Sequence, residues 1–373
     1  MHDVPFYLCD QLIVTQPALV TIVIPTYNYG VFILDAVRSA AAQSYPHTEI
    51  IVVDDGSTDE TAVTLERLQE QIPNLRVITT EHRGVSHARN CGTRAGKGLY
   101  VAYLDADDLW HPTKIEKQVH AMAQYEGDPE WGAVYCLFRP IDEDGAVFGS
   151  APAVETCGYF FARHLVLNLI GNGSGMMMRR DIMLAMGGFD PVLSHCEDLD
   201  VQLRISKRYK IALVREYLVG YRQHPNSASK SHLEMAAAVM SIADKHTSDR
   251  AIPEDLRKAT FAAAHRYLWF KYLKGGATLK GIHTLLKAII AEPAATLDDL
   301  TVRAVPSLSR RITSLRYVIS STDQTKKPHF FDLEPTAGIT PREPRAYARL
   351  SKRFKKYDEI LYERFADPRI DEK

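Results

Sequence analysis

The sequence predicts an α/β fold, a mostly parallel twisted sheet flanked by helices, with a C-terminal α-helical extension. In residues 19–110, four short apolar runs alternate with helical patterns at the spacing of strand–helix–strand crossovers. After residue 230 the strand signals stop and long helical runs follow. We therefore expect an N-terminal lead-in over residues 1–18, an α/β domain over 19–230 and a helical extension over 231–373.

Composition narrows the class of protein. The chain has 45 Lys and Arg against 46 Asp and Glu, a net charge of -1, so no global field favours nucleic acid and we expect no nucleic-acid partner. Its five cysteines are widely spaced without a Cys-x-x-Cys pair, which is typical of reduced thiols in a cytosolic protein. No signal-peptide pattern opens the chain and no apolar run approaches 18 residues, so we expect a cytoplasmic protein without membrane spans.

The first strand–loop–helix unit begins at the apolar run of residues 19–25, which Pro25 ends. Asn28, Tyr29 and Gly30 predict a turn, and a helical pattern over residues 31–44 follows. A run buried on both faces in this way is typical of a central strand in a parallel sheet.

Three further strands are predicted at residues 50–53, 75–80 and 99–104, and a helical pattern separates each strand from the next. Ligands bind at the carboxyl ends of the strands in such sheets. We therefore expect the residues that follow three of these strands to line one crevice. These residues are Pro25 to Tyr27, Asp54-Asp55 and Asp105 to Asp108.

Asp105, Asp107 and Asp108 follow a buried strand directly. Three carboxylates so close together repel one another unless a cation or hydrogen-bond donors hold them, and Mn²⁺ or Mg²⁺ shared with a diphosphate suits such ligands. The alternative is a solvated acidic turn that caps the helix starting near His111-Pro112. We expect Asp108 to be a turn or capping residue in either case.

Residues 113–222 predict a helix over 114–125, a strand over 133–138, a strand and helix ending at Gly187-Gly188, a helix opening at Glu197-Asp198, and a strand over 212–221. Acidic residues in a first helical turn are also favourable helix-dipole chemistry, so Glu197 and Asp198 have a purely structural interpretation.

Six fragments now stand in order along residues 19–225: TIVIPTYNYG, IIVVDDGSTDET, HRGVSHARNCG, YVAYLDADDLWHP, MGGFDP and EDLDVQLR. Together they resemble the inverting glycosyltransferases of family 2, which have the GT-A fold. The resemblance implies a nucleotide-sugar donor, a divalent cation, and an acceptor hydroxyl that attacks the anomeric carbon with inversion.

For the donor, the resemblance implies that Pro25 and Tyr27 contact the base, that Asp55 accepts its imide proton, and that Arg89 binds ribose or phosphate. His82 stands where many relatives have Asn, which is a departure at the base site. The structural alternatives are a helix-entry turn for Asp55 and a helix cap for Arg89.

For the metal, the resemblance implies that Asp105 holds the ribose or a metal-bound water, that Asp107 binds the ion, and that His224 is a late metal or phosphate ligand. Arg222 would contact the diphosphate. A lone His before Pro is otherwise a surface or packing residue, so His224 keeps both interpretations.

For catalysis, the resemblance assigns Asp198 as the general base that takes the acceptor proton, with Glu197 as the less favoured candidate. We expect a carboxylate near its ordinary pKa to suffice, because the hydroxyl becomes more acidic as it attacks. The chain lacks a Gln-x-x-Arg-Trp box, which favours single transfers. The resemblance implies a UDP-sugar donor and a glycan or lipid-linked glycan as acceptor, in cell-envelope polysaccharide biosynthesis. The alternative is a non-catalytic, nucleotide-binding scaffold subunit.

The C-terminal part contains a basic amphipathic helix near residues 345–366, with apolar residues at spacings of three and four. Three roles fit this pattern: docking on the enzyme itself, pairing two subunits in a homodimer, or peripheral contact with an anionic membrane surface where lipid-linked acceptors lie.

Overall fold

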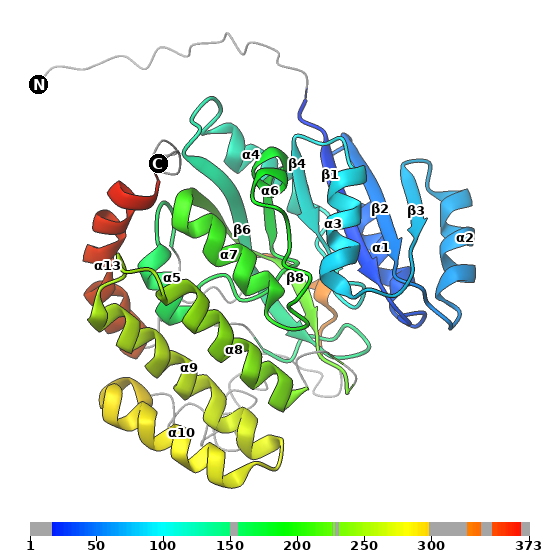
Figure 1. The fold of residues 1–373 in the computed structure, drawn as a ribbon. Coiled ribbons are helices and arrows are strands. Elements are labelled where there is room, and N and C mark those ends of the chain that lie inside the picture. The colour runs from blue at the N-terminus through cyan, green and yellow to red at the C-terminus, as the bar shows by residue number, and fades with distance from the viewer. Residues whose placement is uncertain are drawn as a thin grey trace, which may run out of the picture.

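The computed structural model describes residues 17–149, 156–225, 227, 231–297, 327–336 and 345–366. Almost all of the predicted lead-in therefore lies outside the described residues. An eight-stranded sheet runs through the centre of the molecule in the order β3-β2-β1-β4-β7-β6-β8-β5 (Figure 1). Its strands are β1 (Val20–Thr26), β2 (Thr48–Asp54), β3 (Leu75–Thr79), β4 (Tyr100–Tyr103), β5 (Leu109–Trp110), β6 (Trp131–Ile141), β7 (Met176–Arg179) and β8 (Lys210–Arg222).

The sheet is mixed, with a parallel half and a half that contains reversed strands. β1 pairs in parallel with β2 and β4, and β2 with β3, as the alternation of strands and helices predicts. β7 runs antiparallel to both β4 and β6, and β5 runs antiparallel to β8. The four-residue run of β7 carries no sign of its direction in the sequence.

Helices cover both faces of the sheet. They are α1 (Ile33–Ala41), α2 (Thr61–Gln71), α3 (Val85–Ala95), α4 (Lys114–Ala123), α5 (Phe161–Leu167), α6 (Arg180–Ala185), α7 (Glu197–Arg208), α8 (His232–Thr247), α9 (Glu254–Lys274), α10 (Thr278–Ala291), α13 (Arg345–Phe365) and the short 3₁₀ helix η2 (Phe330–Asp332).

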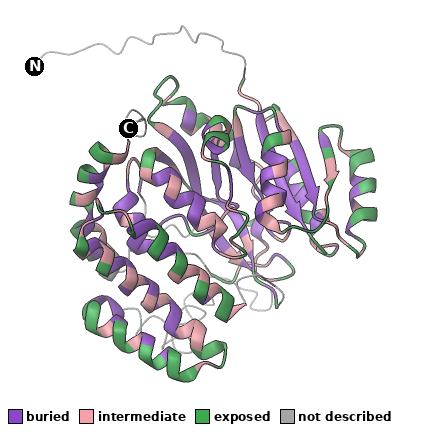
Figure 2. Ribbon diagram, in the orientation of Figure 1, coloured by how far each residue is buried: buried purple, intermediate pink, exposed green. Residues whose placement is uncertain are grey.

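Successive side chains of β1 enter different cores, because side chains alternate across a strand. Val23 packs in the core beneath α5 and α7, whereas Ile22 and Ile24 pack with α1 and α4 on the opposite face. Figure 2 shows the central strands of the sheet mostly buried between these layers, and β1 is buried along its whole length. Burial on both faces explains why the β1 sequence is apolar without interruption.

The basic amphipathic helix, α13, docks on the chain itself. Phe354 and Leu361 are fully buried in the core that α5 and α7 share. The Asp358 carboxylate accepts a hydrogen bond from the Ala162 amide at 2.8 Å and pairs with Arg163. The buried stripe supports the docking alternative among the three predicted roles, because these apolar side chains are not available to a bilayer.

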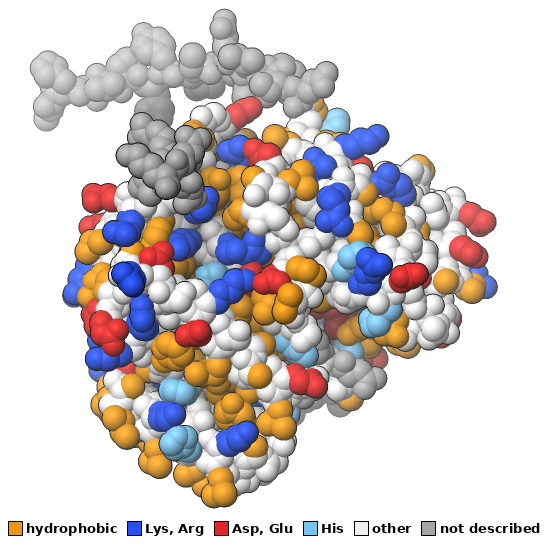
Figure 3. Space-filling model, in the orientation of Figure 1, with side chains coloured by type: hydrophobic (Ala, Val, Ile, Leu, Met, Phe, Trp, Pro, Cys, Tyr) orange, Lys and Arg blue, Asp and Glu red, His pale blue; other side chains and the backbone are white. Residues whose placement is uncertain are grey.

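α10 differs from α13, because its apolar side chains face outward. Leu279, Ile282, Leu286 and Ile290 are exposed, and Leu279 is 85% exposed. Figure 3 shows hydrophobic side chains at the lower end of the molecule, where α10 lies. In the part of the chain that the structure describes, no helix is both long and apolar enough to cross a membrane.

A segment from the C-terminal part returns to the sheet. Phe330 of η2 packs against Leu109 and Ile141, and its amide donates to the Gly145 carbonyl at 3.0 Å. His329 forms a β-bridge with Ala146. The division at residue 230 stays a prediction, since residues on both sides of it build this corner of the α/β layer.

Candidate functional site

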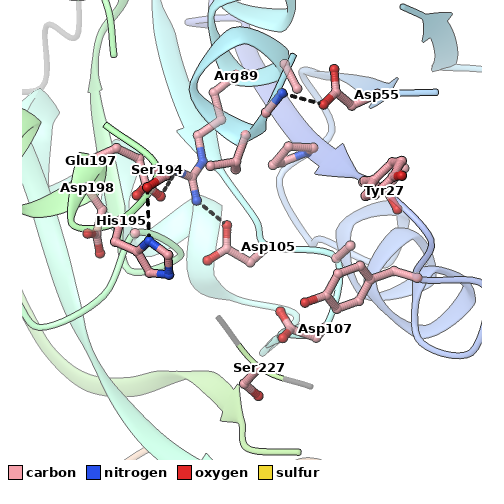
Figure 4. Close-up of a pocket in the computed structure, with 18 of the residues that line it drawn as sticks. Tyr27, Asp55, Arg89, Asp105, Asp107, Ser194, His195, Glu197, Asp198 and Ser227 are labelled. Carbon is pink, nitrogen blue, oxygen red and sulfur yellow. Dashed lines mark hydrogen bonds and ion pairs between the residues drawn. The ribbon is translucent and has the colours of Figure 1, made fainter. Parts of the chain in front are cut away.

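A cavity of about 340 Å³ lies at the carboxyl ends of β1, β2 and β4. Its walls come from the loops after these strands, from α3 and from the first turn of α7 (Figure 4). The crevice predicted from separate loops therefore exists. The predicted site residues that line it are Pro25, Tyr27, Asp55, Arg89, Asp105, Asp107, Glu197 and Asp198.

Asp55 is buried and holds the loop that follows β3. Its carboxylate accepts hydrogen bonds from the Gly84 amide at 2.7 Å, the Arg83 amide at 3.1 Å and the Thr80 hydroxyl at 3.1 Å. Gly84 has a φ of 90°, which glycine adopts readily. Most of the lone pairs of the Asp55 carboxylate therefore accept hydrogen bonds from the protein itself. A nucleotide base would hydrogen-bond to the acceptor positions that are left.

His82 contributes an aromatic surface that the sequence analysis missed. Its ring stacks on Tyr27 with centroids 3.8 Å apart and an interplanar angle of 19°. Its Nδ1 lies 2.9 Å from an Asp55 carboxylate oxygen. The sequence shows that an aromatic side chain, His82, stands two positions before Gly84. Its stacking on Tyr27 could not be predicted, because the two residues meet only in the fold.

Arg89 on α3 joins two separate parts of the site. Its Nη1 donates to Glu197 and its Nη2 to Asp105, both at 2.6 Å, and the side chain is 3% exposed. Burial alone would lower the pKa of Arg89, but Asp105 and Glu197 raise it above its ordinary value. The predicted contact of Arg89 with ribose or phosphate would therefore come from a guanidinium already committed to two carboxylates.

Asp108 is a structural residue, as predicted. It is fully buried and accepts hydrogen bonds from the Ser174 hydroxyl at 2.6 Å and the Arg222 amide at 2.9 Å. Burial, and next the charges of Asp107 and Asp105, raise the pKa of Asp108 well above its usual range. This shift indicates that negative charge accumulates at the end of β4 without full compensation.

Arg222 and His224 lie behind the cavity wall rather than among its lining residues. Arg222 is 2% exposed and its Nε donates to the Asp107 carbonyl at 2.6 Å. His224 is also buried, with Nε2 2.9 Å from an Asp107 carboxylate oxygen. Both residues therefore contact Asp107 from behind, and the contact of Arg222 with a diphosphate stays a prediction.

The residues present fit a divalent ion that shares its ligands with a diphosphate. Asp105 and Asp107 present carboxylates to the cavity, and an imidazole lies behind Asp107. Carboxylate oxygens suit Mg²⁺ and Mn²⁺, which commonly keep water or phosphate ligands. Within the described ranges no group of three or more His, Cys, Asp and Glu side chains is arranged to hold an ion.

The first turn of α7 places Glu197 and Asp198 at the cavity. Cys196 precedes it with a φ of 61°, a left-handed conformation that non-glycine residues rarely adopt. Burial, and next the charge of Glu197, raise the pKa of Asp198 to about 7. We expected an ordinary pKa, and that expectation is wrong, because burial disfavours the charged carboxylate and the negative charge of Glu197 lies close by.

The loop of residues 171–175 also lines the cavity, and the sequence analysis did not include it among the site residues. Asn172 is 3% exposed, and its side-chain oxygen accepts from the Gly175 amide at 2.7 Å. Its Nδ2 has no hydrogen-bond partner among the described residues. A buried donor without a partner beside a cavity indicates a ligand oxygen.

The mixed sheet with its flanking helices has the GT-A fold. Residues 21–183 match the family "Glycosyl transferase family 2".

Three known proteins illustrate the similarity. The chain is 40% identical over 107 residues to the UDP-Glc:alpha-D-GlcNAc-diphosphoundecaprenol beta-1,3-glucosyltransferase WfaP of Escherichia coli, a match that covers 28% of this chain and 41% of that relative. The structure of S. aureus TarS 1-349 in complex with UDP-GlcNAc matches with a TM-score of 0.55 at 18% identity, covering 76% of this chain and 83% of that one. The Pyrobaculum calidifontis mannosyltransferase PcManGT, in complex with GDP-Man and Mn²⁺, matches with a TM-score of 0.52 at 22% identity, covering 82% and 86%.

Proposed function

We propose that this protein is a glycosyltransferase that moves one sugar from a UDP-sugar to a hydroxyl of a glycan or lipid-linked glycan, with inversion and in single transfers. The observation that carries the proposal is the meeting of Asp55, Asp107 and Asp198 around one cavity. These carboxylates come from three distant segments of the chain. A solvated acidic turn or a helix-dipole effect would not require them to share a cavity.

The donor would lie along the carboxyl edge of β1, β2 and β4. Tyr27 and His82 offer stacked aromatic rings for the base, and Asp55 stands beside them. The diphosphate would then reach Asp105 and Asp107. A uridine donor is supported by the names of WfaP and of the TarS complex, whereas the GDP-Man complex shows that the fold also accepts guanosine.

The residues fit a divalent cofactor, Mn²⁺ or Mg²⁺, bound by Asp107 with Asp105 and His224 nearby. Such an ion would offset the charge that develops on the departing diphosphate.

In the transfer, the acceptor oxygen forms a bond to the anomeric carbon of the donor. The bond from that carbon to the diphosphate oxygen breaks, and its electron pair leaves with the nucleoside diphosphate. The hydroxyl proton passes to the Asp198 carboxylate. A pKa of about 7 makes Asp198 an efficient general base near neutral pH, while Glu197 is held by Arg89.

The test is nucleotide release from UDP-glucose, UDP-GlcNAc and GDP-mannose in the presence of Mn²⁺. We expect release by the wild type and at least about 100-fold less by Asp107→Ala, because the charge on the leaving group would be poorly balanced. Asp144→Ala, which removes an exposed acid, serves as the matched control and should keep full activity. Binding of a nucleotide sugar without turnover by the wild type would instead identify the scaffold alternative.

A further inference from the structure

A second cavity of about 340 Å³ adjoins the first one on the side of the helical segments. It lies between α5, α7, α8 and α9. The two cavities share lining residues, among them Gly171, Cys196, Asp198 and Met235. Asp198 therefore stands at the junction, with the donor cavity on one side and this second cavity on the other.

The walls of the second cavity are mainly hydrocarbon. Leu165 of α5, Leu203 of α7, Val239 and Ile242 of α8, and Ala263 of α9 are representative. Among the described residues Asp198 is the one carboxylate that lines it, and Gln202, Thr260 and Arg266 add further polar groups. A mainly apolar cavity of this size with a few polar groups is typical of a small-molecule site.

Two buried polar side chains stand at the cavities, and one of them marks where an oxygen atom of a ligand would lie. The Nδ2 of Asn172, on the donor side of the junction, lacks a partner within the described part of the chain. His164 lines the second cavity and is 1% exposed, and its Nδ1 accepts from the Leu169 amide at 3.0 Å. In the neutral ring Nε2 then carries the proton and can donate it, and the Gln202 side chain, which lines the same cavity, is a hydrogen-bonding neighbour of the ring.

We propose that the second cavity binds a hydrocarbon group on the acceptor, attached close to the sugar whose hydroxyl reaches Asp198. This inference rests on the proposed function and deepens it. The acceptor would be a glycoside with an apolar aglycone rather than a free, fully hydrophilic oligosaccharide. α8 and α9 would then select the acceptor, since they build the walls that a hydrocarbon would contact.

The experiment compares the binding of n-octyl β-glucoside, below its micelle concentration, with that of methyl β-glucoside by titration calorimetry. Both probes carry the same sugar and differ only in the hydrocarbon. We expect the wild type to bind the octyl glucoside at least about tenfold more tightly, because several methylene groups leave water. Ala263→Phe fills the cavity and should remove this preference, as should Val239→Phe from a different helix, should the first variant fail to fold.

Ala237→Phe is the matched control, because Ala237 is an exposed residue of α8 that lines neither cavity. It should bind both probes like the wild type. Equal binding of the two glucosides by the wild type, or an octyl preference that survives both filling variants, would overturn the inference. Donor turnover, measured separately, reports on the proposed function: turnover without an octyl preference refutes only the hydrocarbon site, and the reverse result refutes only the transferase.

Discussion

Two carboxylates stand two positions apart on α7 and have opposite surroundings. Asp200 is fully buried and meets Arg204 Nε at 2.8 Å, with His246 Nε2 and Lys245 Nζ each at 2.9 Å. Burial alone would raise the pKa of Asp200, but hydrogen bonds from His246 and Lys245 and the charge of Arg204 lower it below the ordinary value. Asp198 has no such partners, and its pKa rises to about 7.

The contrast separates a structural carboxylate from a reactive one on the same helix. Asp200 uses its charge to hold α8 against α7, since His246 and Lys245 belong to α8. Asp198 faces both cavities and keeps its carboxylate available. Acidic character in a first helical turn therefore says little by itself, and the partners decide what each acid does.

The largest effect should come from Asp198→Asn. Removal of the general base should lower kcat by about 10²–10⁴-fold, because no side chain then takes the proton from the attacking hydroxyl of the acceptor. Donor affinity and the melting temperature should change little. Among the described residues, the Asp198 side chain accepts a hydrogen bond only from the adjacent Leu199 amide, and asparagine can accept the same bond. Steady-state kinetics and thermal melts check both expectations. A variant that keeps full kcat would break the comparison.

Asp200→Ala should have the opposite effect. Loss of this buried partner leaves the Arg204 and Lys245 charges without their counter-ion and should cost about 3–5 kcal/mol of unfolding free energy. Urea unfolding measures the change. Asp244→Ala, an exposed acid on α8, is the control and should stay within about 0.5 kcal/mol of the wild type. A loss for Asp200→Ala as small as that of the control would show that Asp200 is not structural.

Much of the α/β layer could be predicted from local sequence. β1 and β2 are apolar because they are buried on both faces, and Asp55 and Asp105 follow their strands at one edge of the sheet. Convergence of these loops follows from the parallel topology alone. The direction of β7 could not be predicted, because a run of three methionines followed by Arg179 fits either orientation.

Long-range contacts set the rest, and no local pattern encodes them. Arg89 meets Glu197 across 108 positions, and burial together with the charge of this neighbouring Glu197 raises the pKa of Asp198. Asp358 meets Arg163 across 195 positions, and this contact turns a basic amphipathic helix into a docked one. Such pairings decide whether a charged side chain faces a cavity or a counter-ion. The sequence could therefore suggest the role of Asp198 but could not predict its raised pKa.

The dependence of kcat on pH tests the central claim most directly, namely that Asp198 accepts the acceptor proton. A carboxyl group whose pKa is raised to about 7 is protonated below that pH and cannot act as a base. We therefore expect kcat of the wild type to fall about tenfold for each pH unit below about 7 and to level off above it, while the residual activity of Asp198→Asn lacks this step. A wild-type kcat that stays constant from about pH 5.5 to about pH 8.5 would contradict the account.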